Sequence, residues 1–171
     1  TTMFAMFYNC QALTSINTSN FNTTNVTTMG QMFTDCRSLT NLDVSNFNTA
    51  NVTTMGQMFD DCQSLITLDL SNFNTTKVTS MSNMFYNTGY RSTVFTLNLG
   101  NEFNTSNVTN MHSMFFDTGY SSTVFTLNLG NEFNTSKVTN MDNMFHYTGY
   151  SSPNFTLNLG NQFNTSNVTC M

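Results

Sequence analysis

Apolar residues recur along this chain at fixed intervals, in a polar background rich in Asn and Thr. The pair Met-Phe marks the interval. It occurs six times, beginning at Met6, Met32, Met58, Met84, Met114 and Met144. The first three steps are 26 residues long and the last two are 30 residues long. A repeat of this length is typical of a solenoid, in which each repeat buries its apolar face only against its neighbours.

Each repeat contains a short alternating stretch that predicts a strand. In one repeat the apolar Leu42 and Val44 alternate with Asn41, Asp43 and Ser45. A period of two places Leu and Val on the inner face and the polar residues on the outer face. If the repeats stack in register, these strands form one parallel sheet with a spacing of about 4.8 Å.

The rest of the repeat predicts turns and a second short extended piece. Phe47 follows the strand and fills a corner, where Ser and Asn favour tight turns. Residues 52–55 predict a second short strand, and the segment at Met58 turns back through a single helical or 3₁₀ turn. The expected fold is therefore a repeat solenoid of short parallel strands, turns and short helical turns.

The repeats indicate one continuous unit over residues 1–171. The 26-residue form covers 1–83 and the 30-residue form covers 84–171. The longer form adds one residue before the corner Phe and three residues, Thr-Gly-Tyr, after Met-Phe. Both ends fall at the same phase of the repeat and neither carries a polar cap, so we expect an excised stretch of a longer array.

Composition excludes several classes of function. The net charge is −5, and the four basic residues are scattered at Arg37, Lys77, Arg91 and Lys137. Nucleic-acid binding and attachment to anionic membranes both need clustered Lys and Arg. No apolar run approaches the ~20 residues that span a bilayer. The strict spacing of Phe, Met, Leu and Val argues against disorder.

The whole chain resembles the BspA-like leucine-rich-repeat surface proteins. The resemblance rests on Met-Phe, Cys, Leu-x-x-Leu, Phe-Asn-Thr and Val-Thr-x-Met occurring in this order, as in residues 32–55. The second half departs from the common pattern, since Thr88, Thr118 and Thr148 replace the Cys. The resemblance implies a right-handed, leucine-rich-repeat-like solenoid that is secreted or displayed at the cell surface and acts in attachment. It brings no catalytic residues with it.

Two sets of side chains are candidate contact sites. The inserted loops should align Tyr90, Tyr120 and Tyr150 in a row that stacks on sugars or on a neighbouring solenoid, or folds back over its own loop. The outer strand face offers Asn41, Asp43 and Asp69. The two Asp share a row and could bind a cation weakly.

Cys10, Cys36 and Cys62 occupy one repeat position and should stack as a ladder. Neighbouring Cα atoms would then fall within the ~4.4–6.8 Å that a disulfide allows. In-register side chains point the same way, however, which favours small buried thiols. The spacing of 26 residues matches no zinc motif.

Asn-x-Ser/Thr sequons lie in the turns after the corner Phe. If the chain passes through a secretory route, these Asn could carry glycans, although an Asn- and Thr-rich chain also produces sequons by chance. The candidate acceptors are Asn22, Asn74, Asn104, Asn134 and Asn164.

Two rows of Thr raise ice binding as a remote alternative. One row begins at Thr23 and the other at Thr27, and both recur in every repeat. No nucleophile-base pair or metal-ligand cluster converges, because His112 and His146 come from different repeat positions. We therefore expect no enzyme activity, no metal and no cofactor.

The sequence thus favours an extracellular or cell-surface module with structural and adhesive roles. Its expected partners are surface proteins, glycans or other copies of itself. The principal alternative is a filament subunit whose solenoids meet end to end or side by side, because an open stack leaves strand edges unpaired.

Overall fold

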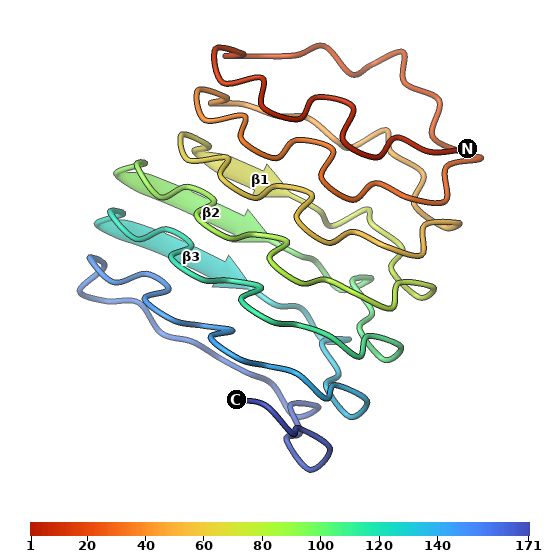
Figure 1. Cartoon of the computed structure of the whole chain (residues 1–171). Coiled ribbons are helices and arrows are strands. Elements are labelled where there is room, and N and C mark those ends of the chain that lie inside the picture. Colours follow the sequence, from red (N-terminus) through yellow and green to blue (C-terminus); the bar gives the residue numbers. More distant parts are fainter.

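The computed structural model describes all 171 residues and contains three short strands and no helix. The strands are β1 (Thr67–Asp69), β2 (Val94–Asn98) and β3 (Val124–Asn128), in one parallel sheet of order β1-β2-β3 (Figure 1). Leu68 pairs with Leu97, and Leu97 pairs with Leu127, which is the predicted register. No segment is a helix of the length and apolarity needed to cross a membrane.

The longest strands lie in the 30-residue repeats because these repeats add an inward residue. Phe95 and Phe125 are 0% and 6% exposed and extend the alternation, so β2 and β3 each have five residues and β1 has three. In the last repeat Pro153 stands where the two before it have Thr93 and Thr123. Proline has no N–H to donate, and no strand forms over residues 154–158.

A second ladder joins successive repeats along another side of the molecule. We call the path of one sequence repeat a coil. The predicted second strand is reduced to a single parallel bridge between each coil and the next. The bridged residues are Thr2, Thr28, Thr54, Ser80, Asn110, Asn140 and Cys170. This ladder continues through both repeat lengths.

The segment around each Met-Phe pair is a run of tight turns, and the predicted helical or 3₁₀ turn is wrong. Gln57 and Asp61 have φ of 59° and 57°, left-handed values that a right-handed helix excludes. The amide of Met58 donates to the carbonyl of Met55 in its own coil, whereas the amide of Asp61 donates to Tyr86 in the next coil. Backbone hydrogen bonds between coils therefore replace those that a helix would form.

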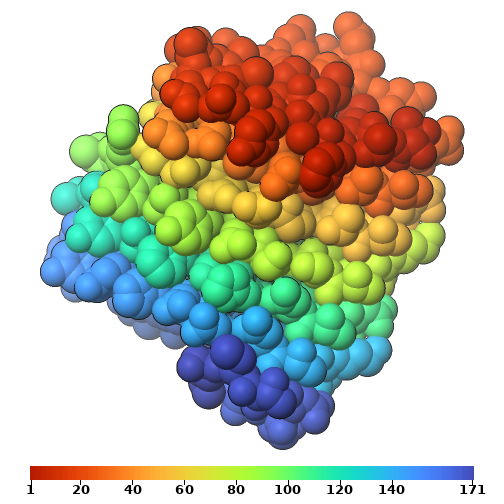
Figure 2. All heavy atoms as spheres, viewed as in Figure 1, coloured from red at the N-terminus to blue at the C-terminus, as the bar shows by residue number.

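The core is one cluster of 36 buried residues that runs through the stack. Phe33, Phe59, Phe85 and Phe115 form a column of nearly parallel rings with centroids 6.0, 5.9 and 5.4 Å apart. The column passes without interruption from the shorter to the longer repeats. Figure 2 shows successive parts of the chain as bands in sequence order on the surface.

Candidate interaction surfaces

Each Thr-Gly-Tyr insertion is held against the core by its glycine. Gly89 and Gly119 have φ of 66° and 64°, and an added Cβ would lie 2.5 and 2.6 Å from the rings of Phe95 and Phe125. Glycine is required because the loop passes directly over a buried ring in a left-handed conformation. The tyrosine that follows each glycine is half-buried or exposed.

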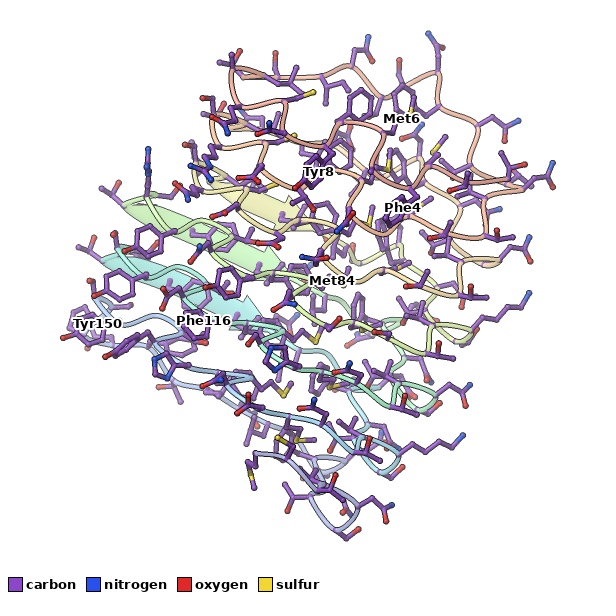
Figure 3. The ribbon with its side chains drawn as sticks, viewed as in Figure 1. Phe4, Met6, Tyr8, Met84, Phe116 and Tyr150 are labelled. Atoms are coloured by element: carbon purple, nitrogen blue, oxygen red, sulfur yellow. The ribbon has the colours of Figure 1, made fainter.

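The inserted tyrosines stack as predicted, and a second aromatic column lies beside them. The rings of Tyr90, Tyr120 and Tyr150 are 4.9 and 5.0 Å apart. Tyr86, Phe116 and His146 stack at 4.8 and 4.7 Å in the second column. Tyr147 links the two, 4.2 Å from His146 and 5.3 Å from Tyr150. The aromatic ridge, part of which is labelled in Figure 3, consists of Tyr86, Tyr90, Phe116, Tyr120, His146, Tyr147 and Tyr150.

Stacking determines which parts of these rings a ligand can reach. The planes of Tyr90 and Tyr120 are 14° apart and those of Tyr120 and Tyr150 are 9° apart, so the rings cover one another's faces. Tyr150 ends the column and is 63% exposed. A sugar ring has room to stack on Tyr150, whereas the rest of the column presents ring edges and hydroxyls.

On the strand face, Asp43 and Asp69 act as turn caps. Their carboxylates accept hydrogen bonds from the backbone amides of Ser45 and Ser71, both at 2.9 Å. Hydrogen bonds from Ser45 lower the pKa of Asp43, and those from Ser71 lower the pKa of Asp69. Asn41 is exposed beside them.

The same position continues as an asparagine ladder in the later coils. Asn98 donates to Asp69 at 3.0 Å, and Asn128 donates to Asn98 at 2.8 Å. Each Asn also caps the following turn, as the Asp residues do. A shallow polar hollow with Asn41, Asp43 and Asp69 in its lining lies on this face. The arrangement explains these residues as parts of the scaffold.

The cysteine column is a set of free thiols. Cys10 is half-buried, whereas Cys36 and Cys62 are buried. The thiol of Cys62 donates to the carbonyl of Phe33 at 3.2 Å, and the hydroxyl of Thr88 donates to Phe59 at 2.8 Å. Thr at this position therefore replaces Cys without loss of the hydrogen bond.

The five turn sequons differ in how free their amide nitrogen is. In each, the side-chain oxygen accepts the backbone amide of the hydroxyl residue two positions on. The Nδ2 atoms of Asn104 and Asn134 also donate to Glu132 and Gln162 in the next coil. Asn22, Asn74 and Asn164 are exposed and make no such bond. Glycosylation at any of the five stays a prediction.

The two threonine rows have different surroundings. Thr49, Thr75 and Thr105 of the first row are at most 2% exposed, and each donates its hydroxyl to a carbonyl of the next coil. The second row is exposed, and the hydroxyl of Thr53 donates to the carbonyl of Thr27 in the preceding coil. The first row is thus part of the interior and is not available to order water.

One Ser-His-Asp contact chain is present, at residues that the sequence did not indicate as a group. His112 lies 3.4 Å from Ser113 Oγ and 3.4 Å from Asp142 Oδ2. Both distances exceed the ~2.6–3.2 Å of an activated nucleophile. Ser113 is 4% exposed, so a substrate cannot approach its hydroxyl.

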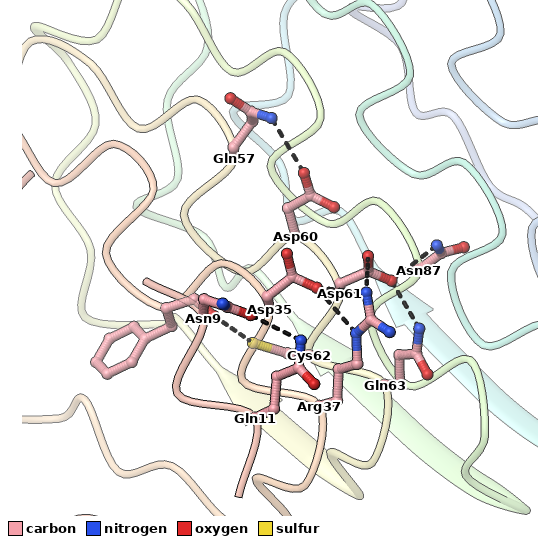
Figure 4. Close-up of polar contacts among 11 residues, drawn as sticks. Asn9, Gln11, Asp35, Arg37, Gln57, Asp60, Asp61, Cys62, Gln63 and Asn87 are labelled. Atoms are coloured by element: carbon pink, nitrogen blue, oxygen red, sulfur yellow. Dashed lines mark hydrogen bonds and ion pairs between the residues drawn. The ribbon is translucent and has the colours of Figure 1, made fainter. Parts of the chain in front are cut away.

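A polar network that sequence reasoning missed flanks the 26-residue coils (Figure 4). Arg37 donates to Asp35 at 2.7 Å and lies 3.7 Å from Asp61 in the next coil. Gln63 and Asn87 both donate to Asp61, at 2.7 and 2.9 Å. An Asn or Asp two residues before Gln or Arg, repeated at one position, was the available signal.

The comparisons with known proteins identify a family. The family model described as "Mycoplasma protein of unknown function, DUF285" matches residues 1–119 and 69–171, which together cover the chain. No curated protein and no solved structure matches it. A repeated family model agrees with the repeated sequence and with the register of the coils. The chain therefore belongs to the DUF285 family.

Proposed function

We propose that the chain is part of a leucine-rich-repeat-like solenoid of the BspA-like kind, and that it acts outside the cell as a structural and adhesive module. The observation that carries this proposal is the aromatic ridge, seven side chains held in two columns on a scaffold whose other polar positions serve its own turns. Aromatic residues are enriched in protein contact sites because they bury area at low entropic cost.

The scaffold supports this role. In-register bridges join every coil to the next, and one apolar cluster runs through the stack. Each coil contacts only its neighbours, so a longer array extends the surface without changing the ridge. Rigid columns also reduce the entropy that a partner's binding would otherwise cost.

Attachment tests the adhesive role. Surfaces coated with the purified chain should retain cultured cells or bacteria. The triple variant Tyr90→Thr, Tyr120→Thr and Tyr150→Thr should lose most of this retention. Its control replaces Thr53, Thr79 and Thr109 with Ala on the exposed threonine row and should retain cells normally. Equal retention by both variants would count against the ridge.

Location is tested separately. Antibodies against the chain should label intact cells of the organism that encodes it, without permeabilisation. Labelling that appears only after permeabilisation would contradict a surface role.

The filament alternative has its own observation. At one end of the stack Phe4, Met6 and Tyr8 are more than half exposed. At the other, Met141, Phe145 and Met171 line a partly apolar hollow. Stacking of two copies would cover both ends. Sedimentation that rises with concentration and approaches no limit would favour this alternative, whereas a monomer at every concentration would remove it.

A further inference from the structure

Three buried side-chain atoms in this chain have no hydrogen-bond partner, and all three are acceptor oxygens. They are Gln63 Oε1, Asn87 Oδ1 and Asp117 Oδ1. Buried polar atoms are almost always paired, so an excess of one kind indicates a missing donor. Gln63 is 8% exposed, and both Gln63 and Asn87 already use their nitrogens on Asp61. No neighbouring amide is left to supply the missing donor.

Asp117 lacks a donor because of the repeat change. Asp35, Asp61, Asn87 and Asp117 occupy one position in successive coils, and the amide of each donates to the next coil in the same way. We call this column the acceptor strip. In the 26-residue coils the residue two positions on, Arg37 or Gln63, donates to the strip. In the 30-residue coils that residue is glycine, Gly119 in the case of Asp117.

The chain contains its own example of how the strip is satisfied. The Arg37 guanidinium donates to Asp35 through both Nε and Nη2, at 2.9 and 2.7 Å. The same Nη2 lies 3.7 Å from Asp61 of the next coil. One guanidinium thus serves carboxylates on two coils, which a planar group with five donors does well.

The surroundings of Asp117 favour a cation. Phe116 precedes it in one aromatic column, Tyr120 lies three residues on in the other, and Tyr147 takes its position in the next coil. Burial first, and then the charge of Asp117, raises the pKa of Tyr86. Burial and neighbouring Tyr150 and Tyr90, followed by Asp117, raise the pKa of Tyr120. The carboxyl therefore lies close to both columns, and guanidinium groups stack on aromatic rings.

We propose that Asp117 and the aromatic ridge bind an arginine side chain from a basic segment of a partner protein. The inference rests on the contact role proposed above and names its partner chemistry. The guanidinium pairs with the carboxyl of Asp117 and packs against the rings of Tyr120 and Tyr147. The net charge of −5 complements such a segment.

Intrinsic tyrosine fluorescence tests the proposal directly. The chain has no Trp, and five of its six Tyr belong to the ridge. The purified chain is titrated with a short arginine peptide at ~0.15 M salt, which screens long-range attraction. A saturable change in fluorescence is expected. A lysine peptide of equal length should bind more weakly, because a point charge lacks the planar fork. Equal binding of the two peptides, or no saturation, would overturn the proposal.

Two matched variants locate the site. Asp117→Asn should weaken arginine-peptide binding about tenfold. Asp43→Asn removes the same charge on the strand face and should leave binding within about twofold. Both substitutions are already found at equivalent positions, as Asn87 and Asn98, so the fold should accept them. Similar losses in the two variants would mean that only net charge matters, and the inference would be wrong.

A third variant tests the rings. Tyr147→Asn, also matched by Asn87, keeps the carboxyl of Asp117 and removes one ring. It should weaken binding severalfold, and unchanged binding would show that the rings play no part. If coated chain retains cells but ignores arginine peptides, this inference fails while the adhesive role stands. If the peptide binds but cells do not attach, the reverse holds.

Discussion

At the scale of single residues, burial gives Asp60 an unusual protonation. Its carboxyl accepts one hydrogen bond, from Gln57 at 3.1 Å, and is otherwise enclosed in the column between Thr34 and Tyr86. Burial raises its pKa from an ordinary 3.8 to about 7, and the nearby charges of Asp61 and Asp35 add to the effect. Near neutral pH this residue is therefore divided between its charged and neutral forms.

Asp60→Asn should stabilise the fold at alkaline pH. A raised pKa means that the folded state binds the proton more tightly than the unfolded state does. Wild-type stability is therefore greatest below about pH 4, falls as pH rises to about 7, and is constant above. The shift of about 3 units corresponds to ~4 kcal/mol, which partial exposure reduces to ~2.

Urea unfolding of the wild type and the variant at pH 5 and pH 8 measures this effect. The advantage of the variant should grow with pH. An advantage that is the same at both pH values would mean that Asp60 does not titrate in this range.

At the scale of elements, the turn after each strand in the longer repeats depends on glycine for two separable reasons. Gly130 and Gly160 have φ of 73° and 69°, and both amides donate to the Asn two residues before, at 3.1 and 3.0 Å. They differ in space. A Cβ at Gly130 would lie 1.8 Å from the carbonyl oxygen of Gly100, whereas at Gly160 it would meet nothing within 4 Å.

Gly130→Ala and Gly160→Ala should therefore have different costs. Gly160→Ala should lose ~1 kcal/mol of stability, because alanine resists a left-handed φ. Gly130→Ala should lose a further ~1–3 kcal/mol, because the coils must separate to admit the methyl group. Urea unfolding of both variants beside the wild type gives the two values. Equal losses would show that the approach of the coils is not limiting.

At the scale of the whole molecule, coils should be removable in units. Deleting residues 101–130 joins Gly100 to Asn131, so each remaining coil keeps its equivalent neighbours. The product should unfold cooperatively and be shorter by about one strand spacing, ~4.8 Å, in X-ray scattering.

Deleting residues 101–128 is the matched control. It removes two residues fewer and places every following column out of register, so a folded product is not expected. If both deletions behave alike, the coils do not depend on register and the solenoid proposal is wrong.

How much of this could be predicted from the sequence varies with the kind of residue. The columns of Leu68 and Leu97, and of Tyr90 and Tyr120, followed from spacing alone, because equivalent residues of stacked repeats must align. The left-handed turns at Gln57 and Asp61 could not be predicted, since neither is glycine and the hydrogen bonds that impose them come from the next coil. The missing strand near Pro153 had a signal in the proline itself.

The candidate site was predicted in part. The tyrosine row was expected, but its covered ring faces follow from stacking distances that a sequence does not give. Asp43 and Asp69 were proposed as contact residues, although an Asp two residues before Ser is also typical of a turn cap. Asp117 carried no signal, because its lack of a donor depends on what Gly119 does not supply.

The exchange of Cys62 for Thr88 at one position has a consequence for the surroundings in which this chain can persist. Burial and the neighbouring Cys10 raise the pKa of Cys36 to about 11, and burial raises the pKa of Cys62 well above its ordinary value. Thiolate is the form that oxidants and electrophiles attack, so these sulfurs are protected near neutral pH. Neither kind of coil needs a disulfide or a reducing environment, and both can be built equally well on either side of a cell membrane.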